Sequence, residues 1–171
     1  MNLQTDLKSE HVSHLVVSGC AQVAVGTSVR DTLALMRADR QVVCLVVDEG
    51  AAAERGGGET GDSQQVRLVG IFTERDVMRK VIDVAGSLDR PVEEVMTRDP
   101  ITIDPDASAA DALRLMDENH FRNLPVVDKD GRLLGNMTHQ AIIHYLADRY
   151  PVEVLNRPID PERFPRRAEG G

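Results

Sequence analysis

The chain has 171 residues, of which 42% are hydrophobic and only 3% aromatic, and its formal net charge is −8. This length suits one ordinary domain or two small ones, built on a core of aliphatic side chains. An acidic surface argues against general binding to nucleic acid or to anionic membranes. It leaves room for a small phosphate ligand, because such a ligand needs only a few local hydrogen-bond donors.

The chain shows no targeting or spanning segment. Residues 1–10 lack the apolar stretch of a signal peptide, and no apolar run approaches the ~20 residues of a membrane span. Cys20 and Cys44 both lie in apolar runs, which favours reduced core thiols over a disulfide. We therefore expect a soluble cytoplasmic protein.

The first predicted helix begins at Ser28, a favourable N-cap that is followed three residues later by Asp31 and then by an apolar stripe. The same pattern recurs at Ser108 and Asp111, 80 positions further along the chain. An offset that stays constant over a whole helix indicates an internal repeat.

Predicted strands repeat in the same way. The apolar run at 44–48 matches 124–128 at the same offset of 80, and 68–73 matches 133–138 at an offset of 65. The difference of 15 residues is an insertion in the first copy, at residues 50–65. Its alanines, glycine triplet and polar residues predict a flexible, solvated hairpin loop.

A buried strand runs directly into a helix over residues 66–82. Thr73 is a good N-cap with Asp76 three residues later, and a strand that ends at a helix N-terminus presents free N–H groups that suit a phosphate. The hydroxyl and the carboxylate could also hold a sugar. The same pair is also an ordinary capping box, and this stretch alone favours that interpretation over a ligand site.

The repeats define the expected organisation, a mixed α/β (α+β) fold of two β-α-β-β-α repeats packed about a pseudo-twofold axis. We predict an N-terminal extension at 1–15, a first repeat at 16–86, a linker at 87–94, a second repeat at 95–149, and an extended proline-containing tail at 150–171. On the helix stripes, the methionines predicted to fill the core are Met36, Met78 and Met116.

This doubled unit resembles a pair of CBS domains, also called a Bateman module. The motifs that carry the resemblance are the Gly-x-x-Thr-x-x-Asp pattern of residues 70–76, the Leu-Pro-Val-Val segment at 124–127, and the Met-Thr-Arg-Asp-Pro lead-in at 96–100. They occur in the expected order, and the resemblance covers residues 16–149. It implies a stand-alone CBS pair with no catalytic domain.

The family binds adenosine-containing ligands, such as AMP, ADP, ATP or S-adenosylmethionine, in the cleft between its repeats. By matching position, the resemblance implies that Thr73 contacts phosphate and Asp76 contacts ribose, whose two hydroxyls suit a carboxylate. The remaining implied contacts are aliphatic residues around the adenine and polar residues from the opposite repeat, namely Ala21, Val42, Val43, His120, Arg122 and Asn123. Of these, Arg122 is the expected phosphate partner.

The second copy departs from the motif, because Ala141 stands where the carboxylate would be. Loss of a charged acceptor costs about 1.5–3 kcal/mol. We expect one competent site, in the first repeat, and one that is weakened or empty.

Neither an enzyme nor a metal site is predicted. His11 and His14 lack a third ligand nearby, and the glycine triplet at 56–58 lacks the lysine and hydroxyl of a P-loop. The expected function is therefore a regulatory sensor that needs no cofactor and signals through subunit or partner contacts.

The resemblance further implies a homodimer, through helix faces at 77–81 and 142–145 that could equally be internal core, and leaves room for an unidentified protein partner. Two alternatives remain. One is a ligand-independent dimerisation or interaction scaffold, which the loss of the carboxylate at Ala141 favours, and the other is a small nucleotide-converting enzyme.

Overall fold

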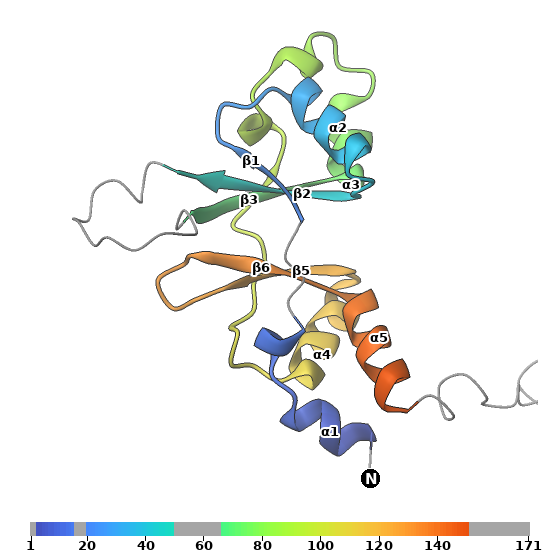
Figure 1. The fold of residues 1–171 in the computed structure, drawn as a ribbon. Coiled ribbons are helices and arrows are strands. Elements are labelled where there is room, and N and C mark those ends of the chain that lie inside the picture. The colour runs from blue at the N-terminus through green and yellow to red at the C-terminus, as the bar shows by residue number, and fades with distance from the viewer. Residues whose placement is uncertain (1–2, 16–19, 50–65, 151–171) are drawn as a thin grey trace, which may run out of the picture.

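The computed structural model describes residues 3–15, 20–49 and 66–150 of the chain. Two β-sheets lie face to face at its centre, and helices cover their outer faces (Figure 1). The larger sheet has the strand order β1-β2-β3-β4, and the smaller one consists of β5 and β6.

The first repeat contains one parallel and one antiparallel strand pair. Its elements are β1 (Ala21–Ala24), α2 (Val29–Ala38), β2 (Val43–Asp48), β3 (Arg67–Thr73), α3 (Glu74–Asp76) and the π-helical turn η3 (Val77–Val81). Strand β1 lies parallel to β2, which requires the crossover through α2, whereas β2 and β3 form an antiparallel hairpin.

The second repeat reproduces this arrangement with α4 (Ala109–Asn119), β5 (Asn123–Val127), β6 (Leu133–Thr138) and α5 (His139–Arg149). Ile103 forms a parallel bridge with Val126, 80 positions after the Val23–Val46 pair of the first repeat. Both predicted helix starts are confirmed, because Ser28 and Ser108 each accept a hydrogen bond from the backbone N–H three residues later. The predicted α/β fold of two repeats is confirmed.

The short segment that precedes each repeat packs on the other repeat. The N-terminal elements α1 (Leu3–Ser9) and η1 (Val12–His14) lie against α4, where the Val12 N–H donates to the Ala107 carbonyl at 2.9 Å. The linker contains η4 (Ser87–Asp89) and η5 (Val92–Glu94), and there the Val92 N–H donates to the Thr27 carbonyl at 2.8 Å. The two donors are 80 positions apart in the chain, and so are the two acceptors. The pseudo-twofold relation between the repeats therefore also relates these two exchanged segments.

The connection between the two sheets, residues 87–98 and called the linker from here on, also adds a strand to the first sheet. Strand β4 (Thr97–Arg98) pairs antiparallel with β3, with Gly70 opposite Arg98 and Ile71 opposite Thr97. The hairpin ends of the two repeats meet as well, since the Leu133 N–H donates to the Val66 carbonyl at 3.0 Å.

Each repeat has its own hydrophobic core between sheet and helices, and a third apolar layer lies between the sheets. Along β2, Cys44 and Val46 belong to the core of the first repeat. Val43, Leu45 and Val47 alternate with them, belong to neither core cluster, and are at most 3% exposed. Because side chains alternate across a strand, these three face the second sheet.

The helix after β3 differs from the prediction. A continuous α-helical stripe was expected there, but one α-turn leads into a π-turn, which is wider and changes the facing of the following residues. Met78 is consequently 69% exposed, so its predicted core role is wrong, whereas Met36 and Met116 are buried as predicted.

The helix faces suggested for a dimer contact prove to be partly internal, because Val81 and Ile142 are buried in the two cores. The predicted loop at 50–65 and the tail from 151 lie outside the described residues. Tyr150, the first residue assigned to the tail, is buried, and its hydroxyl donates to the Asp6 carboxylate.

Candidate functional site

The end of β3 and the start of α3 form a complete capping box, as predicted. Thr73 has an extended backbone, and its Oγ1 accepts from the Asp76 N–H at 3.4 Å. In return, Asp76 Oδ2 accepts from the Thr73 N–H at 3.1 Å and from the Thr73 hydroxyl at 2.8 Å. This geometry satisfies the helix start without any ligand.

The other oxygen of the same carboxylate is bound from outside the capping box. Asp76 Oδ1 accepts from Lys80 Nζ at 2.9 Å and from the Thr97 hydroxyl at 3.0 Å. The Asp76 side chain is only 8% exposed, whereas that of Lys80 is 41% exposed. The Asp76 carboxylate is thus buried and accepts four hydrogen bonds, one of them from a lysine that reaches solvent.

Lys80 connects this cluster to the linker. Besides Asp76, its ammonium donates to the carbonyls of Val95 at 2.8 Å and Met96 at 3.1 Å. Gly70 allows the linker to approach, because a Cβ there would meet Met96 Sδ and would lie 2.9 Å from the Thr97 carbonyl oxygen. The carboxylate therefore holds the π-turn and strand β4 together.

The predicted aliphatic residues lie at the same end of the sheet, in three different environments. Val43 pairs with Thr73 and is buried, while Val42 is 51% exposed and accepts at its carbonyl from the Glu74 N–H at 3.4 Å. Ala21 packs in the hydrophobic core of the first repeat. The structure thus brings Val42 and Val43 next to Thr73, while the Ala21 side chain faces the core.

The polar residues expected from the opposite repeat gather at the equivalent end of the second sheet. Asn123 pairs with Thr138, and the Arg122 carbonyl accepts from the His139 N–H at 3.0 Å. His120 is exposed in a left-handed conformation after α4. These contacts attach Arg122 and Asn123 to the start of α5, whereas His120 ends α4.

The second repeat carries an amide pair where the first is aliphatic. Thr138 caps α5 by accepting from the Ala141 N–H at 3.1 Å, and Ala141 supplies no carboxylate. Asn136 Nδ2 donates to Asn123 Oδ1 at 3.0 Å, and Asn136 is 2% exposed with no partner at its Oδ1. By the repeat offsets, these asparagines occupy the places of Val43 and Ile71.

Sequence reasoning missed Lys80, Thr97 and Asn136. The position of Lys80 four residues after Asp76 was a usable signal, because such pairs share a helix face. Thr97 gave no local signal, since its contact spans 21 positions through the linker. Asn136 could be recognised as a buried polar residue only from the structure.

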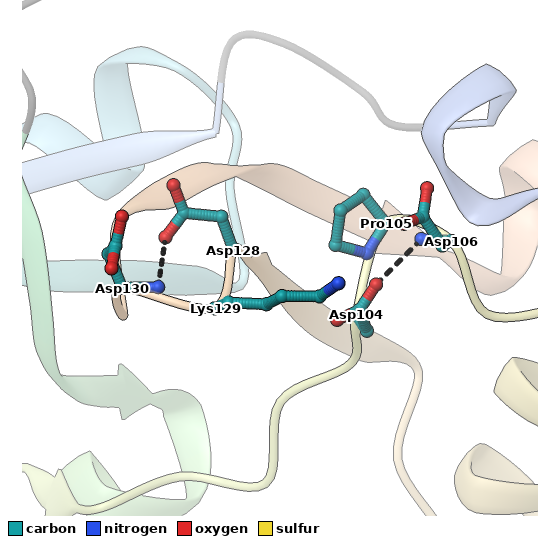
Figure 2. Close-up of a pocket in the computed structure, with 6 residues that line it drawn as sticks. All are labelled: Asp104, Pro105, Asp106, Asp128, Lys129 and Asp130. Carbon is teal, nitrogen blue, oxygen red and sulfur yellow. Dashed lines mark hydrogen bonds between the residues drawn. The ribbon is translucent and has the colours of Figure 1, made fainter.

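An acidic hollow lies at the opposite end of the second sheet, near the β5–β6 turn (Figure 2). Asp104 and Asp128 there accept from the N–H groups of Asp106 at 2.8 Å and Asp130 at 2.9 Å, so they stabilise their own turns. Pro105 and Lys129 complete the lining.

Over residues 3–15, 20–49 and 66–150, no group of three or more histidines, cysteines or acidic residues could hold a metal ion. His14 instead pairs with Glu10 at 2.7 Å. Within the same described residues, no helix has the length and apolar character to cross a membrane. Burial raises the pKa of the Cys44 thiol to about 12.

Comparison with known proteins identifies a CBS domain over residues 92–148. An uncharacterized 17.7 kDa protein of Acidianus ambivalens is 36% identical over 92 residues, which is 54% of each chain. The arabinose 5-phosphate isomerase GutQ of Salmonella typhi is 33% identical over 132 residues, covering 76% of this chain but 36% of the isomerase. The chain thus spans about half, or less, of these curated relatives.

Among solved structures, CBSX2 in complex with AMP superposes with a TM-score of 0.64 at 25% identity. The match covers 82% of this chain and 98% of CBSX2. It extends well beyond residues 92–148, so both repeats are represented.

Proposed function

Because this chain belongs to the CBS-domain family, we propose that it is a regulatory module that binds an adenosine-containing ligand between its two repeats. The candidates are AMP, ADP, ATP and S-adenosylmethionine, and the site is the one around Thr73 and Asp76. Arg122, Asn123 and His120 would approach from the second repeat. The AMP complex of CBSX2 supports this class of ligand.

The observation that carries the proposal is the Asp76 carboxylate, whose side chain is 8% exposed in α3, directly after β3 and near the aliphatic Val42 and Val43. A carboxylate can accept from both ribose hydroxyls, and Val42, which is 51% exposed, offers apolar surface to a flat base. Thr73 adds a hydroxyl at the same point. Because Ala141 replaces the carboxylate in the second repeat, a single adenosine site per chain is proposed.

A homodimer is part of the proposal, as the way in which binding is signalled. Met78 and Ile143 are 69% and 48% exposed and occupy equivalent places in the two repeats, 65 positions apart. Exposed apolar side chains at matching positions on two helical segments suit a self-complementary contact. The module would act in the cytoplasm and would not convert its ligand, which incubation with ATP or AMP and analysis for products would test.

The test is a thermal-shift panel of AMP, ADP, ATP and S-adenosylmethionine on the full chain. A ligand at a hundred times its Kd stabilises by about 2.7 kcal/mol, which raises Tm by roughly 5–10 °C in a chain of this size. Asp76→Asn should remove the ligand-induced rise. Asp111→Asn is the matched control, because Asp111 occupies the same capping position on α4 and is exposed.

A rise that survives Asp76→Asn would place the ligand elsewhere. A flat response of the wild type to every ligand would instead favour the alternative of a ligand-independent dimerisation or interaction scaffold.

A further inference from the structure

The Asp76 carboxylate has no free acceptor position for a ribose. Its two oxygens offer about four lone-pair sites, and four donors occupy them, two from Thr73 and one each from Lys80 and Thr97. The bonds from Thr73 form the capping box and start the helix. A ribose must therefore replace the donors at Oδ1, which are Lys80 and Thr97.

Lys80 would remain at the site after this replacement. Its three N–H groups are directed to Asp76 Oδ1 and to the carbonyls of Val95 and Met96. If the ribose takes Oδ1, two bonds to the linker still hold the ammonium, and its third N–H becomes available to the ligand. The side chain is 41% exposed, so a solvent-borne group can reach it.

We infer that Lys80 is a specificity-determining residue, which makes the Asp76 site select adenosine ligands that carry phosphate over the positively charged S-adenosylmethionine. This inference rests on the proposed function and narrows its ligand class. An ammonium beside the ribose attracts a phosphate and repels a sulfonium.

The second repeat supports the pairing of these two functions. Tyr145 stands 65 positions after Lys80, and Ala141 stands 65 positions after Asp76. The repeat that lacks the ribose carboxylate thus also lacks the cation. The absence of both residues from the second repeat fits the direct bond between Lys80 and Asp76 in the first.

Isothermal titration of the full chain with AMP, adenosine and S-adenosylmethionine tests the inference. The wild type should bind AMP about tenfold to a hundredfold more tightly than S-adenosylmethionine, as one charge-assisted hydrogen bond allows. Lys80→Met should lower this ratio by at least about tenfold, and Lys80→Arg should largely restore it. Since each ratio is taken within one variant, a general loss of stability cancels.

Arg79→Met is the matched control, because it removes the same charge from an exposed neighbour that lacks Lys80's position beside Asp76. An equal effect of Arg79→Met would overturn the specific role of Lys80, as would an unchanged ratio in Lys80→Met. A wild type that binds AMP, adenosine and S-adenosylmethionine equally would overturn this inference alone. A wild type that binds none of them would overturn the proposed function as well.

Discussion

Replacement of Asn136 by isoleucine should stabilise the protein. Asn136 lies between the sheets with 2% exposure, and its Oδ1 has no hydrogen-bond partner. A buried polar group without a partner costs about 1–3 kcal/mol. Isoleucine is the residue at the equivalent place in the first repeat, Ile71, so its shape suits this position in a strand.

The net gain should be about 1–2 kcal/mol, because some of it is offset by the larger side chain and by the lost bond to Asn123. That corresponds to a Tm higher by roughly 2–8 °C, and to a raised midpoint of urea unfolding with an unchanged m-value. Asn136→Val, with a smaller side chain, separates the polar effect from overpacking.

Asn123→Val alone provides the opposite control. It removes the one partner of Asn136 Nδ2 and leaves the whole buried amide unpaired, so it should destabilise by about 1–3 kcal/mol. If both Asn136→Ile and Asn136→Val unfold more easily than the wild type, the reasoning is refuted, and the Asn136 carbonyl must be stabilised by a partner such as a buried water.

Three further outcomes follow from the geometry. Gly70→Ala should cost about 1–3 kcal/mol in urea unfolding, because its Cβ would meet Met96 and push β4 away; an unaffected midpoint would mean that β4 is not held tightly. Ser108→Ala should lower Tm by roughly 2–4 °C, since a lost N-cap costs about 1 kcal/mol, whereas no change would show that the Ser108 cap contributes little. Above pH 9 the unfolded Cys44 thiol ionises while the folded one, with a pKa raised to about 12, keeps its proton. Stability should therefore fall as pH rises from about 9 towards 12, by at most about 1.4 kcal/mol per pH unit, and Cys44→Ala should flatten that slope measured by denaturant titration at several pH values.

The repeat was readable from the sequence because its signals are local. Ser28 and Ser108 cap helices through bonds that span three residues, and the apolar runs of β2 and β5 differ little from each other. Thr73 and Asp76 were found for the same reason. Local hydrogen-bond patterns survive in any context, so a single copy is enough to predict them.

What the sequence did not reveal depends on contacts between distant segments. The exchange of lead-in segments joins Val12 to Ala107, and the bond from Thr97 to Asp76 runs through the linker. The exposure of Met78 follows from a π-turn, for which a helical stripe gives no warning. By analogy, Arg122 and Asn123 were expected to reach from the second repeat to a ligand on the first. In the structure their backbones contact His139 and Thr138 of their own repeat.

The exchanged lead-in segments have a consequence for synthesis on the ribosome. The N-terminal segment finds its place on α4 only after Ala107 has emerged, because Val12 bonds to that carbonyl. The first repeat, by contrast, can be completed as soon as the linker has left the exit tunnel. Until α4 has emerged, the apolar face of α1 and η1, with Leu7 and Val12, is exposed on the nascent chain. The earliest residues of a newborn chain thus fold only together with the second repeat, and a ribosome that stalls between the repeats would present an unfinished surface to chaperones.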